Sequence, residues 1–429
     1  MNLSEANKWA SAVARRILHR QPSMSWNAAQ IYFYQFLAIL LGLVSNIIIA
    51  RLLGPKEKGV YDLYVLLSNF ISEIGTLGFG YGLLYYLLSQ CRAIAEVHGT
   101  GLVFSAVMGL VTAAIGFSGL AILRSSFQGL PDWIILLCFF SSPFLYYRII
   151  WGNLLLGIDK SVTIYRNSFL LSAIILAGVL VLWQVERVSA STVVVLNMLA
   201  TLAITIVGAT VLLSDLRKTT FNFALAKDSL KYGWIFFIGH LANVLHFRID
   251  QIMVNHWLGT EKVGVYAVSL RWAEMLFVLD TGIIAATFYK AGSAAGAESY
   301  DMSLRHAKLM LAIMSSVGLL LAISSYPLVY FLYGEAYLDA TLPLVILIPG
   351  IAFWSSGKIL SRYLSYNQGK MWLTTGCSVV GLCINVLLNL MLIPKYGLIG
   401  ASTASSISYI TVIILIFWIY QQARPSGNE

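Results

Sequence analysis

The segment WIFFIGHLANVLHFRIDQIMVNHWLG, residues 234–259, sets the fold class and raises the functional question. It is long enough to cross a bilayer, because a spanning helix needs about 20 mostly apolar residues. It nevertheless carries His246, Arg248 and Asp250 near its middle. A charge at that depth costs about 2.5 to 3.5 kcal/mol. We therefore expect a membrane helix whose charged side chains face protein or water rather than lipid.

The rest of the chain has the composition of a membrane protein. Of its 429 residues, 59% are hydrophobic and 11% are charged, and the mean hydropathy is +0.78. No soluble globular domain normally has these values. The sequence predicts an all-α polytopic membrane protein with about twelve transmembrane helices. We place them at residues 28–50, 59–88, 99–123, 133–157, 167–184, 192–213, 233–258, 264–289, 308–333, 342–367, 371–393 and 398–421.

The loop cations predict the orientation of these helices. If the N-terminus is cytoplasmic, most Lys and Arg residues of the loops fall on the cytoplasmic side, which favours placing both termini there. The net charge of +9 is then a topology signal. Because the basic residues are scattered over many short loops, we do not expect nucleic-acid binding. Residues 1–27 are polar and lack the apolar core of a cleaved signal peptide.

An internal repeat divides the chain into halves. LLGPKEKGVY at 52–61 recurs without a gap as WLGTEKVGVY at 257–266. At the same offset, polar residues of the first two spans match polar residues of the seventh and eighth: Gln35 with His240, Asn46 with Gln251, Asn69 with Glu274 and Thr76 with Thr281. A second correspondence matches Lys160 with Lys370 and Arg148 with Lys358. The repeat predicts two parallel six-helix lobes.

The lobes define the expected domains. We place an N-lobe at 28–213 and a C-lobe at 233–421, with cytoplasmic segments at 1–27, 214–232 and 422–429. Transporters built from repeats have their substrate sites at the repeat interface, near the middle of the membrane.

Equal numbers of cations and acids lie within the predicted spans: Arg148, Arg248, Arg271, Lys358 and Arg362 against Asp62, Glu73, Asp250, Glu274 and Asp280. Helical spacing places Asp62, Asn69, Glu73 and Thr76 on one stripe of the second span. On the seventh span, Arg248 and Asp250 point in nearly opposite directions, so they cannot pair within their own helix.

Two interpretations of these charges stay open, and they are compatible. In the first, the charges form salt bridges that hold the two lobes together. In the second, the cations bind an anion. Lys358 and Arg362 are like charges four residues apart, which repel unless an anion or a carboxylate lies opposite. Lys358 also has Arg148 as its repeat partner, and two such cations suit a phosphate or pyrophosphate headgroup.

Metal and enzyme chemistry have little support in the sequence. The four cysteines are expected to be free thiols, and the histidines lack a zinc-ligand spacing. His240, His246 and His256 lie on one helix, where polar packing or a proton-linked role is the better interpretation. We expect no catalytic residues, no metal and no cofactor, apart from H⁺ or Na⁺ as a coupling ion.

Three segments carry a family resemblance. ARLLGPKEKGVYDLYVLLSNFISEIGTLGFGYGLLYYL (50–87), FRIDQIMVNHWLGTEKVGVYAVSLRWAEMLF (247–277) and LMLIPKYGLIGASTASSISY (390–409) resemble signatures of Wzx-type flippases for lipid-linked oligosaccharides, which are polysaccharide biosynthesis proteins of the MOP superfamily. The resemblance implies two six-helix lobes around a central cavity lined mainly by spans one, two, seven and eight. One departure is that the second span ends in LLYYLLSQ, where related sequences often have a basic residue, and this puts a headgroup contact at Tyr85 or Tyr86 in doubt.

The resemblance implies a flippase, not an enzyme, that moves an undecaprenyl-pyrophosphate-linked oligosaccharide across the bacterial plasma membrane. Its partners would be the lipid-linked oligosaccharide, membrane lipid and polysaccharide polymerase or assembly proteins. On this interpretation the pyrophosphate binds Arg148, Arg248, Arg271, Lys358 and Arg362. Ion coupling or gating falls to Glu73, Asp250, Glu274 and Asp280. The polar lining of the cavity is Gln35, Asn46, Asp62, Asn69, His240, Asn243, His246 and Gln251.

Two alternatives remain. A MATE-like multidrug antiporter would have the same fold, but it predicts acids without central cations. A membrane glycan polymerase or ligase generally needs a sizeable outside loop, and the outside loops here, such as RLLGPKEKG, are short.

Overall fold

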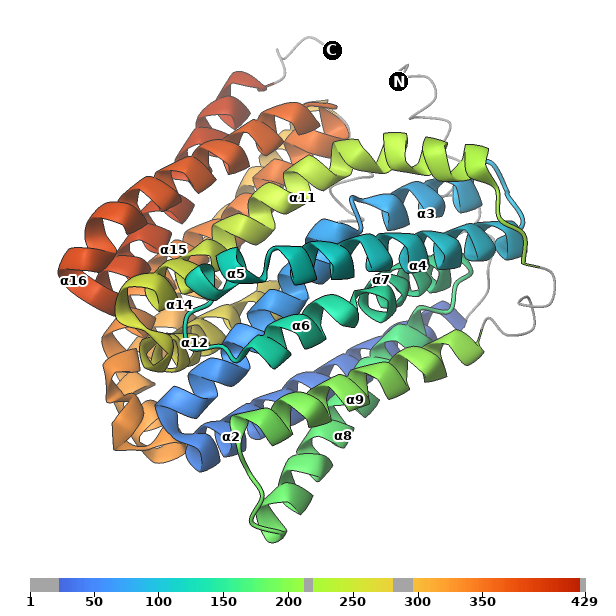
Figure 1. The fold of residues 1–429 in the computed structure, drawn as a ribbon. Coiled ribbons are helices and arrows are strands. Elements are labelled where there is room, and N and C mark those ends of the chain that lie inside the picture. Colours follow the sequence, from blue (N-terminus) through green and yellow to red (C-terminus); the bar gives the residue numbers. More distant parts are fainter. Residues whose placement is uncertain (1–22, 212–218, 281–295, 425–429) are drawn as a thin grey trace. The chain divides into compact units, whose positions relative to one another are not determined.

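The computed structural model describes residues 23–211, 219–280 and 296–424, and every regular element in these ranges is a helix (Figure 1). Residues 1–22, 214–218 and 425–429 of the expected cytoplasmic segments lie outside the described residues, as does Thr281. Seven of the described helices are long and apolar enough to cross a membrane, or eight if the bent pair α6 and α7 forms one span. The chain is a multi-pass membrane protein.

The chain divides into two compact units. Unit 1 comprises residues up to Leu53, Tyr64–Leu123 and Leu130–Phe237, and unit 2 comprises Gly54–Leu63, Arg124–Gly129 and the residues from Ile238 onward. The boundary between the long segments falls inside α11 (Phe223–Leu258). The lobe limits expected at residues 213 and 233 stay a prediction.

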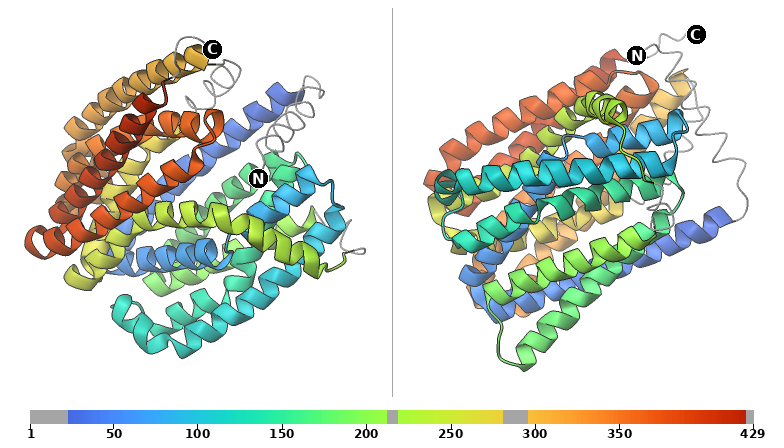
Figure 2. Two further views of the ribbon diagram at one scale, coloured as in Figure 1. Left: turned by 90° about the horizontal axis from the view of Figure 1, so that it is seen from above. Right: turned by 45° about the vertical axis from the view of Figure 1, so that its right-hand side comes forward.

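Unit 1 is built around α7. Its helices are α2 (Ser23–Gly75) outside Gly54–Leu63, α3 (Phe79–Ser89), α4 (Ile94–Ser118), the start of α5 (Leu120–Ser126), α6 (Asp132–Phe140), α7 (Ser142–Gly157), α8 (Ser161–Gln184), α9 (Ala190–Thr210) and the first part of α11. Helix α7 packs against α3, α4 and α9, while α8 and α9 form a helical hairpin (Figure 2).

Unit 2 is built around α15. Its helices are the second part of α11, α12 (Thr260–Glu274), α14 (Gly296–Tyr333), the 3₁₀ helix η1 (Glu335–Ala340), α15 (Thr341–Arg362), the π-helical η2 (Tyr363–Asn367) and α16 (Met371–Gln422). Helix α15 packs against α12, α14 and α16, and it is buried along most of its length.

Two helices have too many residues for a single span and bend at a glycine. Helix α2 has 53 residues and breaks at Gly54, and α16 has 52 residues and breaks at Gly397. At 1.5 Å per residue each is roughly 80 Å long, more than twice the thickness of the hydrocarbon core. Each helix therefore supplies two arms. The arms of α16 fall on the predicted spans at 371–393 and 398–421, and those of α2 fall on the span at 28–50 and on the first part of the span at 59–88.

The second span differs from its prediction. The helix ends at Gly75, and Leu77 and Gly78 have positive φ angles of 48° and 73° before α3 begins. Thr76 therefore leaves the stripe that the spacing predicted, and its hydroxyl donates to the carbonyl of Glu73. Similarly, the span at 133–157 breaks at Ser141, where α6 and α7 meet at 43°.

The backbone at the matched glycines supports the internal repeat. Gly54 has φ 71° and ψ 172°, and Gly259, its repeat partner, has φ 83° and ψ 172°. This region of φ and ψ is essentially restricted to glycine. Both halves thus begin their second helix with the same non-helical residue.

Candidate functional site

Arg248 on α11 forms a two-armed ion pair with Glu274 at the end of α12. Its Nη1 donates to Oε1 at 2.6 Å and its Nη2 donates to Oε2 at 3.0 Å. The guanidinium fork matches the two carboxylate oxygens, which makes this one of the stronger kinds of hydrogen-bonded pair. Both partners belong to unit 2. Arg248 does not line the pocket described below.

Lys358 on α15 forms a second ion pair within unit 2. Its Nζ donates to Oδ2 of Asp280 at 2.6 Å, and the hydroxyl of Ser355 donates to the same oxygen at 2.9 Å. Asp280 is only 1% exposed, whereas Lys358 is 34% exposed. The ammonium also lies 4.1 Å from the centre of the Phe277 ring, a cation–π contact. Asp280 is therefore the carboxylate that lies opposite Lys358.

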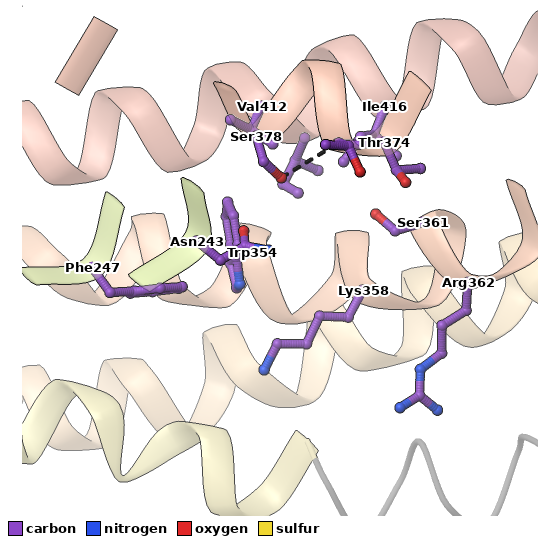
Figure 3. Close-up of a pocket in the computed structure, with 12 residues that line it drawn as sticks. Asn243, Phe247, Trp354, Lys358, Ser361, Arg362, Thr374, Ser378, Val412 and Ile416 are labelled. Atoms are coloured by element: carbon purple, nitrogen blue, oxygen red, sulfur yellow. Dashed lines mark hydrogen bonds between the residues drawn. The ribbon is translucent and has the colours of Figure 1, made fainter. Parts of the chain in front are cut away.

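A pocket of about 390 Å³ lies beside Lys358 (Figure 3). The volume falls in the range of small-molecule sites. Its polar lining consists of Asn243, Lys358, Ser361, Arg362, Thr374, Thr375 and Ser378. Its aromatic and aliphatic lining consists of Phe247, Trp354, Val412, Ile413 and Ile416. The pocket is thus polar on one part of its wall and apolar on another.

The two cations of the pocket leave α15 on the same side. Lys358 and Arg362 lie one helical turn apart, and in Figure 3 both side chains extend in the same direction. Two cations held in this way can contact a ligand that carries more than one negative charge.

Asp250 lies in a buried polar cluster rather than in an ion pair. The carboxylate is 0% exposed. Its Oδ2 accepts hydrogen bonds from the hydroxyls of Tyr266 at 2.7 Å and Ser405 at 3.1 Å, and its Oδ1 accepts from the backbone N–H of Gln251 at 2.8 Å. Within the described ranges, no Lys or Arg forms an ion pair with it.

The cluster continues into α16. The amide of Asn385 donates to the hydroxyls of Ser405 and Ser408 at 3.3 and 3.2 Å, and Nε2 of His246 lies 2.8 Å from the Ser408 hydroxyl. All four side chains are fully buried. His246 and Asp250 were predicted from the sequence as site residues, whereas Tyr266, Ser405, Ser408 and Asn385 were not. Asn385 within an apolar span was the available signal.

A third ion pair joins Lys58 and Asp62 in the segment of α2 that belongs to unit 2. The Lys58 side chain is 1% exposed, although the sequence placed this residue in an outside loop. Lys58 lies in the polar stretch RLLGPKEKG, so the sequence gave no sign that its side chain is buried. Arg271 acts electrostatically on both partners, so Asp62 and Arg271 lie in one charged cluster.

The remaining candidate cation belongs to unit 1. Arg148 on α7 is acted on electrostatically by Glu73 near the end of α2. Arg148 is the repeat partner of Lys358, which pairs with Asp280. The two halves are therefore alike in this respect. In each, a cation on the fourth span of that half (Arg148 or Lys358) has an acid on the second span of that half (Glu73 or Asp280) as its electrostatic partner.

The other predicted cavity residues differ in how far they are buried. Gln35 and Asn46 are half-buried and Asn69 is exposed, all in unit 1. In unit 2, His240 and Asn243 are half-buried, and the amide of Asn243 donates to the carbonyl of Gly239. Gln251 is buried beside Asp250.

Solved structures of 12 to 15% sequence identity share this fold. A lipid II flippase MurJ in an inward closed conformation superposes with a TM-score of 0.73 at 15% identity, over 92% of this chain and 88% of that one. An inward-facing MATE multidrug resistance transporter of the MOP superfamily gives 0.67 at 14% identity, over 91% and 93%. A MOP superfamily transporter from Pyrococcus furiosus, described as having a binding pocket of reversed polarity, gives 0.61 at 12%, over 92% and 95%.

Sequence comparison places the chain in a family. An uncharacterized membrane protein of Methanocaldococcus jannaschii is 24% identical over 212 residues, which cover 48% of this chain and only 40% of that protein. The family model described as "Polysaccharide biosynthesis protein" matches residues 48–342, well over half of the chain. The chain therefore belongs to the polysaccharide biosynthesis protein family and has the all-α fold of the MOP superfamily.

Proposed function

We propose that this protein is a flippase for an undecaprenyl-pyrophosphate-linked oligosaccharide. It would move the headgroup from the cytoplasmic to the outer leaflet of a bacterial plasma membrane by ion-coupled alternating access. Membership of the polysaccharide biosynthesis family supports the substrate class. The lipid tail stays in the bilayer while the polar head crosses.

The pocket beside Lys358 is the observation that carries the proposal. Lys358 and Arg362 supply two positive charges for a pyrophosphate. Hydroxyls of Ser361, Thr374 and Ser378 can exchange hydrogen bonds with a sugar, and the ring of Trp354 offers it an apolar face. Because Asp280 neutralises Lys358 here, an arriving pyrophosphate would compete with that carboxylate. This competition can link binding to movement of α15.

Asp250 is the proposed site of ion coupling. A fully buried carboxylate with no ion-pair partner in the described ranges is costly unless protonated or bound to a cation. Oxygens of Tyr266 and Ser405 already surround it. Oxygen ligands of this kind suit H⁺ or Na⁺. Glu73, Glu274 and Asp280 would then act as gates, since each is the electrostatic partner of an arginine or lysine.

Binding of farnesyl pyrophosphate, a short polyprenyl pyrophosphate, to the purified protein in detergent tests the proposal. The wild type should bind it, and farnesol, which lacks the charges, should bind at least tenfold more weakly. Lys358→Gln and Arg362→Gln should each weaken binding, while Lys395→Gln, an exposed lysine outside the pocket, should not. Equal binding of farnesol would contradict the anion site.

A MATE-like cation antiporter is the second candidate, because MATE transporters share the fold and Asp250 is an unpaired buried acid among the described residues. It predicts binding of organic cations that is lost in Asp250→Asn and unaffected in Lys358→Gln. Testing tetraphenylphosphonium with the same variants separates the two functions.

A further inference from the structure

His246 lies between the pocket and the Asp250 cluster. Its imidazole is 0% exposed. On one side its ring contacts Trp354, with centroids 5.4 Å apart, and Trp354 lines the pocket. On the other side its Nε2 lies 2.8 Å from the hydroxyl of Ser408. The residue therefore touches both a wall of the pocket and the buried polar cluster.

The hydrogen bonds around Ser408 favour one direction for this contact. The Ser408 hydroxyl is placed to donate its proton to the carbonyl of Ser405 at 2.9 Å. In that arrangement it accepts from Nε2–H of His246 and from the amide of Asn385. Asn385 also donates to the Ser405 hydroxyl, which donates to Asp250. A continuous chain of hydrogen bonds thus joins His246 to the Asp250 carboxylate.

The imidazole has little room to move by itself. A Cβ added at Gly381 would lie 2.9 Å from Cε1 of His246 and 2.1 Å from Cγ2 of Val412. The Tyr409 ring packs against it with centroids 4.9 Å apart. Because Trp354 lines the pocket and its ring contacts the imidazole, a displacement of the imidazole acts on the pocket wall.

We propose that His246 is a positioning residue that couples a cation at Asp250 to the shape of the anion pocket. The proposal rests on the proposed function and deepens it. A proton or Na⁺ at Asp250 replaces the Ser405 hydroxyl proton as the partner of the carboxylate. Ser405 then turns, Asn385 and Ser408 follow, and His246 shifts Trp354.

Charged and titratable groups on α11, α12, α15 and α16 lie near this chain of hydrogen bonds. They are Asp250 and Arg248 on α11, Tyr266 and Glu274 on α12, Lys358 on α15 and Tyr409 on α16. A pH effect on the pocket could therefore arise at several groups, so the test uses variants of His246 and its hydrogen-bond partner, and measures Na⁺ as well as pH dependence.

The test measures the Kd of farnesyl pyrophosphate for the purified full chain, with and without Na⁺ and across a pH series. In the wild type, a cation should change Kd by about 5- to 150-fold. His246→Phe keeps a ring against Trp354 but removes the Nε2–H donor, so Kd should lose most of this cation dependence while binding persists. His246→Gln restores an N–H donor and should restore part of the dependence.

Two further variants separate coupling from folding. Ser408→Ala removes the acceptor and should reproduce the loss, and the double variant His246→Phe with Ser408→Ala should be no worse than either single change. Ser402→Ala is the matched control, because Ser402 is equally buried on α16 but its hydroxyl donates only to carbonyls of its own helix. It should keep the full cation dependence.

The outcomes distinguish the coupling from the function. If the wild type does not bind farnesyl pyrophosphate, the proposed function fails and the coupling fails with it. If the wild type binds with cation dependence and both His246→Phe and Ser408→Ala retain it, the function stands and the role of His246 is wrong. Binding without any cation dependence in the wild type also overturns the coupling.

Discussion

Arg248 and Asp250 are two residues apart on α11, yet their side chains join different parts of unit 2. Arg248 forms its two-armed ion pair with Glu274 of α12, while Asp250 accepts from Tyr266 of α12 and Ser405 of α16. Protein groups thus contact both charges in the middle of this predicted membrane helix. Arg248 forms an ion pair within unit 2, and the Asp250 carboxylate accepts hydrogen bonds from two hydroxyls.

The first prediction concerns the Arg248 and Glu274 pair. Arg248→Ala and Glu274→Ala should each lower the melting temperature in detergent, because each leaves the other charge unpaired. The double variant should be more stable than the sum of the two losses predicts, with a coupling free energy of about 0.5 to 3 kcal/mol.

The pair's contribution to transport is then measured separately. If Arg248 also contacts the headgroup, the double variant should regain stability without regaining surface glycan. Recovery of both would assign Arg248 to the scaffold alone. A coupling free energy near zero would show that the ion pair does not form in the protein in detergent.

The second prediction concerns the repeated glycines. Ala at position 259 should destabilise the protein by about 1 to 3 kcal/mol, because φ 83° and ψ 172° are essentially restricted to glycine. The space around Gly259 is open, so the cost is one of backbone conformation rather than of contact. The measurement is the melting temperature of Gly259→Ala.

Gly152→Ala is the control for that change. Gly152 also has open space around a new Cβ, but it lies inside the helix α7, where alanine should be stabilising by about 0.5 to 1 kcal/mol. Equal effects of the two substitutions would show that the conformation at Gly259 is not as described.

The third prediction concerns topology. Reporter fusions after Gln90, Leu225, Ser299 and Gln368 should be cytoplasmic, and fusions near Lys56, Gln128, Arg187, Lys262 and Tyr337 should be external. The breaks at Gly54 and Gly397 require the chain to turn there, since neither α2 nor α16 can be one straight span. One inverted pair of fusions would rule out twelve spans.

Hydropathy and repetition predicted the fold because both are carried by the sequence itself. Long apolar runs define membrane helices, and the matched Gly54 and Gly259 mark the repeat. The breaks near Leu77 and at Ser141 were missed because glycine, serine and proline are also tolerated inside spanning helices, so these residues gave no clear sign of a break.

The candidate site was predictable only in part. Ionisable residues in a span signal a functional or paired group, and this identified Lys358, Asp280 and Asp250. The pairing itself depends on which helices become neighbours. Helical spacing could therefore show that the side chains of Arg248 and Asp250 point apart. It could not show that Arg248 pairs with Glu274 or that Asp250 accepts a hydrogen bond from Ser405.

The last prediction separates anion binding from stabilisation at the repeat-related cations. Lys358→Gln should weaken binding of farnesyl pyrophosphate about 10- to 100-fold, the loss expected for one charge-assisted hydrogen bond. It should also lower stability, because the buried Asp280 carboxylate loses its ion pair with Lys358. Adding Asp280→Asn should restore stability but not binding, since the neutral amide tolerates burial while the positive charge is still missing.

Arg148→Gln provides the comparison in the other half of the repeat. If both cations serve the headgroup during transport, each single change should reduce surface glycan, and the double variant should be little worse than the worse single variant because both act on one ligand. Melting temperature in detergent is measured beside surface glycan for both singles, the double and Lys395→Gln. Export could instead fall in parallel with stability across this set and recover when Asp280→Asn is added. Lys358 would then be a structural cation, and the proposal that the pocket binds the pyrophosphate would be wrong.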